Sequence, residues 1–225
     1  MKLSKIELFV AQLLLLEGGQ APESEEYNVL RMTYGRLRNN GYTPAAMTVD
    51  GLQPTLYSLP LTAARSLWRD YYGTKGVDKM DGTHLRIMSY PDWLMALQRA
   101  CWLPLCCDKM PYQQLSNVVA DCVLFYADAR VVLSQLLDIL EQNRQLFHRP
   151  FDPLPPTEVI TQQVTRRLYC QIRSTEVCNS VVRQLTDHRI AFIQERAATD
   201  ALWARHADAL IQRAERMAAA NTFAA

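Results

Sequence analysis

The stretch RMTYGRLRNNGYTP, residues 31 to 44, interleaves three arginines with two tyrosines. Cations can neutralise nucleic-acid phosphates and release condensed counterions, and flat aromatic rings can stack on bases. The wider window from Tyr27 to Lys79 holds seven cations against three carboxylates, a net charge of +4, with six of the ten tyrosines. The whole chain carries a formal charge of only +1, so the prediction of a polyanion-binding surface depends on this local excess.

Helical geometry sorts these cations into two sets. Arg31 and Arg38, seven residues apart, share one stripe of a helix expected from about Ser24 to Gly41. A helix expected from Thr62 to Gly73 has small residues near its start, as groove-docking helices do. The alternative is that arginine stems cover core edges and tyrosine rings are buried. The predicted nucleic-acid-binding residues are Arg31, Arg38, Arg65, Arg69, Tyr72, Lys75 and Lys79.

Signatures of enzyme chemistry are lacking in the sequence. There is no Gly-x-Ser-x-Gly, GxGxxG, GxxxxGK or HExxH run. Asp187 and His188 are adjacent on an expected helix and so point in different directions, unlike a base and its orienting group. The GxxG sequence from Gly73 to Gly76 resembles a backbone-clamping loop, but its flanks offer no three-stranded sheet, which favours a simple turn. We therefore expect no catalytic residue and no cofactor.

Six cysteines raise the question of a metal or disulfides. Cys101, Cys106 and Cys107 lie close in sequence, but a tetrahedral zinc site would need Cys122 to return as the fourth ligand. Buried thiols that pack as small hydrophobic groups are the favoured interpretation, with no metal. The apolar run LFVAQLLLL is too short for a membrane span and has no cleavage site, so we expect a cytoplasmic protein with reduced thiols and no membrane contact.

The fold class expected from the sequence is mainly α. The eight glycines all lie at or before Gly82, so residues 1–115 are expected to form a turn-rich helical part, the candidate nucleic-acid-binding domain. Residues 116–225 are expected to form a bundle of long helices, a candidate assembly domain with a proline-rich hinge at 148–156. No segment alternates as a strand does, and the one place left open for strands is a short hairpin between Lys75 and Met88.

Several helix ends are marked by capping signals. Ser4 with Glu7 has capping-box spacing, and Thr43-Pro44 predicts the start of a short helix ending near Gly51. Pro91 opens a helix that runs to Pro104. In the second part, residues 116–147 carry one broad apolar stripe. Thr157 is expected to cap the next helical run, which we expect to be two or three helices with restarts at Ser174-Thr175 and Thr199-Asp200, packed as a bundle.

Residues 59 to 94 include LPLTAARSLWRDYYG and, further on, an Asp-Trp-Leu run. This region resembles the middle of the C subunit of the bacterial flagellar master regulator, in which a leucine-aromatic-basic-acidic run ends on glycine and a later Asp-Trp pair opens a helix. The resemblance implies a DNA-binding transcriptional activator that works in a hetero-oligomer. The matching residues are Leu67, Trp68, Arg69, Asp70, Gly73, Asp92 and Trp93.

Three functional hypotheses follow from the sequence. The first is a DNA-binding transcriptional regulator that contacts duplex DNA through its N-terminal part and assembles with itself or a protein partner through its C-terminal helices. The second is a nucleic-acid-binding subunit of a ribonucleoprotein or mobile-element complex that holds single strands or RNA by tyrosine stacking. The third is a helical adaptor that binds no nucleic acid, which the near-neutral total charge and long apolar stripes would suit.

Overall fold

The computed structural model of the chain describes residues 3–18, 27–39, 45–49, 51–143 and 162–219. These residues are mainly helical, which confirms the expected fold class. The chain divides into two compact units, residues 1–103 and 104–225. This boundary lies twelve residues before the one expected from the sequence, between residues 115 and 116. Each unit is described separately below.

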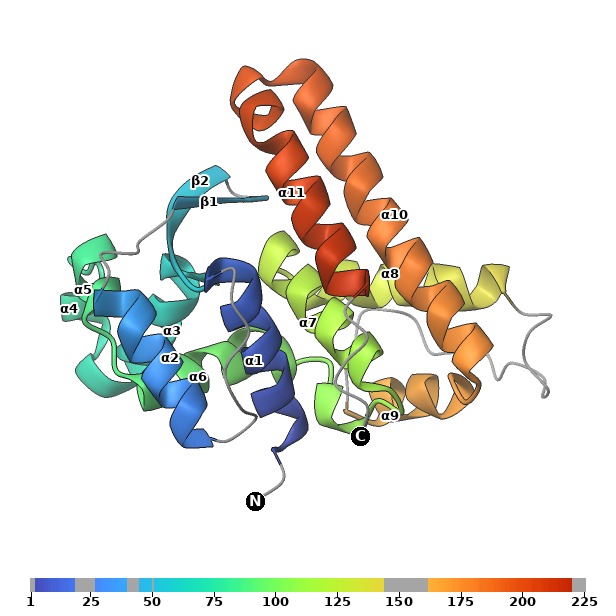
Figure 1. The fold of residues 1–225 in the computed structure, drawn as a ribbon, viewed down its shortest axis with the longest axis horizontal. Coiled ribbons are helices and arrows are strands. Elements are labelled where there is room, and N and C mark those ends of the chain that lie inside the picture. Colours follow the sequence, from blue (N-terminus) through green and yellow to red (C-terminus); the bar gives the residue numbers. More distant parts are fainter. Residues whose placement is uncertain (1–2, 19–26, 40–44, 50, 144–161, 220–225) are drawn as a thin grey trace. The chain divides into compact units, whose positions relative to one another are not determined.

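The first unit combines helices with a small antiparallel sheet (Figure 1). A π-helical turn, Gln98–Trp102, continues its last α-helix. The elements in chain order are α1 (Lys5–Gly18), α2 (Tyr27–Asn39), β1 (Ala45–Thr48), β2 (Gly51–Leu56), β3 (Leu59–Pro60), α3 (Leu61–Tyr72), α4 (Thr74–Val77), α5 (Gly82–Arg86) and α6 (Tyr90–Leu97).

Three helices of the first unit lie close to where the sequence predicted them, although the α-helix opened by Pro91 ends at Leu97 and continues as the π-helical turn. The Glu7 carboxylate accepts from the Ser4 backbone N–H at 2.6 Å and fixes the start of α1. The helix α3 ends at Gly73, whose φ of 69° suits glycine. Ser89 caps α6 by accepting from Asp92 N at 3.3 Å. The helix expected from Ser24 to Gly41 is present as α2, and both of those end residues lie outside the described residues.

The short helix expected after Thr43-Pro44 is wrong. Residues Ala45–Thr48 form β1, which pairs with β2 in the order β1-β2-β3, with Thr48 opposite Gly51. Gly51 has a φ of 100°, and an Asp-Gly pair between two strands is a strong hairpin signal that outweighs a proline start. Strand β2 turns back into β3 with Leu56 opposite Leu59.

The hairpin considered between Lys75 and Met88 is also wrong, because this segment forms α4 and α5. Asp81 caps α5 by accepting from the backbone N–H of Thr83 at 2.9 Å and of His84 at 3.4 Å. His84 returns the bond, since its Nδ1 lies 3.2 Å from the Asp81 backbone nitrogen. This reciprocal cap stabilises the start of a helix. The segment also lacks the apolar-polar alternation that a strand would need.

Buried aromatic rings form the core of the first unit. Tyr34, Tyr57, Tyr90 and Trp93 make edge and tilted ring contacts with centroids 5.1 to 6.0 Å apart. Trp93 Nε1 donates to the Leu56 carbonyl oxygen at 2.8 Å, which ties α6 to the sheet. Burial of this kind holds α2, α6 and the hairpin in one unit.

The second unit is all helical in its described residues. The single amphipathic segment expected over residues 116–147 is divided, because Ala127 has a φ of 53° and Asp128 caps a new helix by accepting from Arg130 N at 2.8 Å. A 3-10 turn, Cys107–Lys109, precedes the helices. The α-helices are α7 (Gln113–Tyr126), α8 (Ala129–Gln142), α9 (Gln162–Gln171), α10 (Thr175–Thr199) and α11 (Ala201–Ala219).

Both expected restarts in the C-terminal run are confirmed. Ser174 caps α10 by accepting from Val177 N at 3.1 Å, and Asp200 caps α11 by accepting from Leu202 N at 2.7 Å. Helices α10 and α11 form an antiparallel pair, and both pack against α7 (Figure 1). The hinge at 148–156 and the cap at Thr157 lie outside the described residues.

Candidate nucleic-acid interface

The helix α3 presents one buried face and one exposed face. Ala64, Leu67 and Trp68 are buried in the first unit, at the spacing of an amphipathic helix. Thr62, Ser66 and Arg69 are exposed, with the spacing that puts them on one outer stripe. The outer face therefore offers the Ser66 hydroxyl and the Arg69 guanidinium group to solvent, with Thr62 on the same stripe at the first turn.

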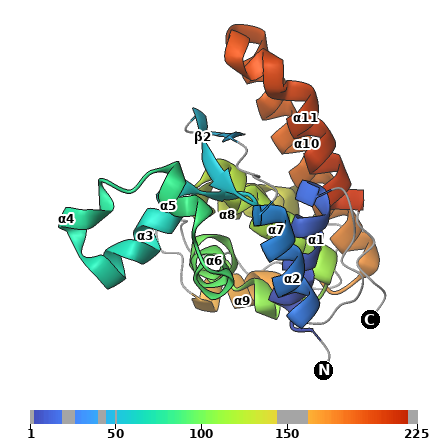
Figure 2. The same cartoon turned by 60° about the vertical axis from the view of Figure 1, so that its left-hand side comes forward.

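A hairpin lies beside the first turn of α3. The hydroxyl of Thr62 donates to Gln53 Oε1 on β2 at 3.4 Å. Pro54, also on β2, lies so close to the start of α5 that a Cβ at Gly82 would come within 3.2 Å of the proline ring. Figure 2 shows β2, α3 and α5 together. Strand β2 thus contacts α3 through Gln53 and lies close to α5 through Pro54.

Arg65 is half-buried and has a positioning role. Its Nε donates to the carbonyl oxygen of Met80 at 2.9 Å, and its Nη2 donates to the same oxygen. These bonds hold the segment before α5 against α3 and bring Lys79, which is exposed, next to the arginine stripe. The Arg65 side chain and the backbone that follows Lys79 are therefore held together, and Arg69 lies one turn further along α3.

Carboxylates around this stripe are partly neutralised. Asp70, which follows Arg69 on α3, forms an ion pair with Arg99. In the described part of the chain no ion pair involves Arg69. Asp78 and Asp81 lie on either side of Lys79 in the sequence.

Arg31 and Arg38 are on α2, which packs against a different set of elements from α3. Helix α2 packs against α1 and α6, whereas α3 packs against the sheet and against α4, α5 and α6. Arg38 is half-buried, and its Nη1 lies 3.4 Å from the Met88 carbonyl oxygen, which also accepts from the Tyr34 hydroxyl at 2.8 Å. Arg31 is exposed.

Two of the tyrosines in the predicted window are core residues. Tyr34 and Tyr57 are fully enclosed, and the Tyr57 hydroxyl donates to the Tyr34 carbonyl oxygen at 3.2 Å. Burial raises the pKa of both phenols well above the ordinary value for tyrosine. These two rings are closed to stacking by bases. The side chains of Tyr72 and Lys75 lie outside the described residues.

Sequence reasoning missed the hairpin residues Gln53 and Pro54 and the pairing of Asp70 with Arg99. The Asp50-Gly51 pair was the signal that would have placed a hairpin before α3. No comparable signal announces the ion pair, because Asp70 and Arg99 are far apart in the chain and meet only through the packing of α3 against α6.

Comparisons with models of protein families, with curated proteins and with solved structures found no match for this chain. Within the described ranges, no group of three or more histidine, cysteine or acidic side chains is arranged to hold a metal ion. The helices described above include none with both the length and the apolar character of a membrane span.

Proposed function

We propose that this protein binds nucleic acid through the outer face of α3, with duplex DNA as its preferred ligand. The observation that carries the proposal is the exposed stripe of Thr62, Ser66 and Arg69, because its neighbouring carboxylate on Asp70 is already neutralised by Arg99. Hydroxyl and guanidinium groups are the usual donors to phosphate oxygens, and arginine also reads guanine edges.

The geometry favours a duplex over a single strand. A short helix with a hairpin beside its first turn suits a groove, while single-strand binding relies on exposed aromatic platforms. Tyr34 and Tyr57 are buried and cannot serve as such platforms. With the resemblance to the flagellar regulator subunit, this supports a transcriptional regulator that acts in a homo- or hetero-oligomer, assembled through its C-terminal helices.

Binding of mixed-sequence duplex DNA, single-stranded DNA and RNA, measured across a salt series, tests the proposal. We expect the duplex to bind most tightly and Arg69→Ala to lower the slope of log K against log salt by about one phosphate contact. Arg205→Ala removes an exposed cation from α11 and serves as the matched control. Equal and negligible binding of all three polymers at low salt would leave only the adaptor hypothesis.

A further inference from the structure

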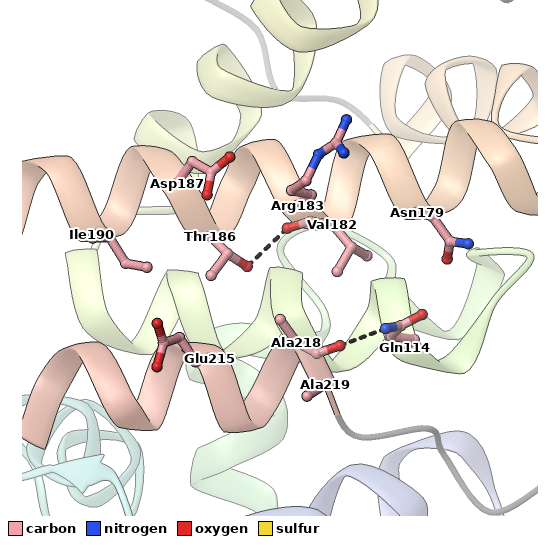
Figure 3. A pocket seen from close by; sticks show the side chains of 10 residues that line it. All are labelled: Gln114, Asn179, Val182, Arg183, Thr186, Asp187, Ile190, Glu215, Ala218 and Ala219. Carbon is pink, nitrogen blue, oxygen red and sulfur yellow. Dashed lines mark hydrogen bonds between the residues drawn. The ribbon is translucent and has the colours of Figure 1, made fainter.

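A groove runs along the second unit where α7, α10 and α11 come together (Figure 3). Its volume is about 370 Å³, and Val182, Ile190 and Ala218 supply apolar lining. Two polar side chains in it are already satisfied. The Thr186 hydroxyl donates to the Val182 carbonyl oxygen at 2.8 Å, and Gln114 Nε2 donates to the Ala218 carbonyl oxygen at 2.5 Å. The Thr186 hydroxyl and the Gln114 amide therefore have hydrogen-bond acceptors within the second unit, and the apolar side chains remain as the surface that an occupant could cover.

The border of the groove carries an excess of negative charge. Glu215 points from α11 toward the side of α10 that bears Thr186 and Ile190 (Figure 3). Asp187 and Arg183 border the groove from α10. All three charged side chains are exposed, and no ion pair among the described residues involves them. Two carboxylates against one guanidinium group suit an occupant with an apolar side chain flanked by cations.

The outer face of α2 has that chemistry. Met32 is 67% exposed, the residue before it is Arg31, and Arg36 follows one turn later on the same face. Leu30 and Tyr34 are buried, so the opposite face is the one that packs in the first unit. A large exposed apolar side chain with arginines beside it is the composition of an interface centre with a charged rim.

Gly35 adds a second reason to regard this face as a docking surface. A glycine inside a helix costs about 1 kcal/mol relative to alanine. Among the residues that the structure describes, no contact requires it, because a Cβ at Gly35 would meet none of their atoms within 4 Å. One turn after Arg31 and next to Arg36, it leaves the backbone open to close approach from outside.

We propose that this face of α2 docks into the α10–α11 groove of a second copy of the chain. Met32, a flexible side chain that adapts to irregular apolar surfaces, enters beside Val182 and Ile190. Arg31, the residue before Met32, meets Glu215. A second copy is the chosen occupant because one chain carries both surfaces, with opposite signs of charge. This inference rests on one part of the proposed function, namely that the protein assembles into an oligomer through its C-terminal helices. The contact involves neither Arg69 nor nucleic acid.

Sedimentation of the full chain over a concentration series, without nucleic acid, tests this contact. We expect reversible self-association that Arg31→Glu and Glu215→Arg each weaken by about tenfold in the dissociation constant, whereas the double variant regains most of the loss. Met32→Asp is expected to weaken association at least as much. Glu195→Arg and Arg205→Glu reverse exposed charges elsewhere on α10 and α11 and are expected to change nothing.

Gly35→Gln separates docking from folding. Glutamine is a good helix former, so the variant is expected to melt at a higher temperature while its added side chain weakens association. A wild-type chain that stays monomeric at millimolar concentration overturns the proposal. So does association that survives Met32→Asp, or a double variant, Arg31→Glu with Glu215→Arg, that is no tighter than either single variant. Because the assay contains no DNA, each of these failures leaves the proposed DNA binding by α3 unaffected.

Discussion

Asp121 on α7 and Arg189 on α10 form a buried ion pair, with 2.5 Å between Oδ2 and Nη1. Arg213 on α11 reaches the other carboxylate oxygen at 2.8 Å, and the Arg189 guanidinium also lies 4.4 Å from the centre of the Phe125 ring. One carboxylate thus joins three helices. Burial alone would raise the pKa of Asp121, but Arg213 and Arg189 outweigh it and lower the pKa below the ordinary value.

Asp121→Asn is expected to destabilise the protein by about 3–5 kcal/mol, because it removes the counter-charge of the buried Arg189 guanidinium. Arg189→Met is expected to cost less, since Arg213 still balances Asp121 and methionine fills the space beside Phe125. The free energy of unfolding in urea measures both. Asp138→Asn, on the exposed face of α8, is the control. Equal losses for the two core variants would contradict this account of the charge balance.

The correctly predicted elements are those whose signals are local. Ser4, Ser174 and Asp200 each accept or donate bonds within their own first helical turn, so a short sequence window contains both partners. The same holds for Gly73 at the end of α3. Several helix ends could therefore be predicted from the sequence alone.

Features that depend on distant partners could not be predicted. In the turn between β2 and β3, Tyr57 and Ser58 have φ values of 45° and 67°. Positive φ values are uncommon for residues other than glycine, so the sequence does not indicate this turn. Their partners are Tyr34, through its carbonyl oxygen, and Glu17, through its carboxylate. In the candidate site, sequence periodicity put Arg65 and Arg69 on one stripe, but only the fold reveals that Met80 holds Arg65.

Substitutions of Arg65 and Arg69 are expected to have different effects, the first mainly on the stability of the fold and the second mainly on DNA binding. Arg65→Ala removes two bonds to the Met80 carbonyl oxygen and leaves a half-buried acceptor, so it is expected to lower stability by about 1–3 kcal/mol and to loosen the Lys79 segment. Arg69→Ala is expected to change stability by less than about 0.5 kcal/mol and to weaken DNA binding. Thermal unfolding and duplex binding of both variants check this. A large stability loss in Arg69→Ala would show that Arg69 also has a structural role.

The six cysteines are expected to differ sharply in reactivity. Cys170 is exposed, whereas the other five are buried. Burial raises the pKa of Cys122 to about 12 and of Cys178 to about 11, so neither thiol forms the reactive thiolate near neutral pH. Titration of the native protein with a disulfide reagent at pH 7 to 8 is expected to modify one thiol rapidly, and Cys170→Ser to abolish that phase. Rapid modification of Cys122 or Cys178 in the folded protein, located by peptide mapping, would contradict the packing of α7 and α10.

The Asp81–His84 pair predicts a pH dependence at the start of α5. A hydrogen bond from the His84 side chain, followed by one from the Thr83 backbone, lowers the pKa of Asp81 from 3.8 to about 2. A depressed carboxyl pKa contributes stability above the ordinary value, and that contribution is lost as the pH falls from about 4 toward 2. The Asp81 carboxyl resonance, followed by NMR, is expected to titrate near pH 2 in the wild type and closer to 3.8 in His84→Ala. Asp81→Asn keeps an oxygen that accepts from Thr83, so it is expected to flatten the acid dependence of unfolding without removing the cap. An Asp81 titration that is the same with and without His84 would contradict the hydrogen bond from the His84 ring to the Asp81 carboxylate.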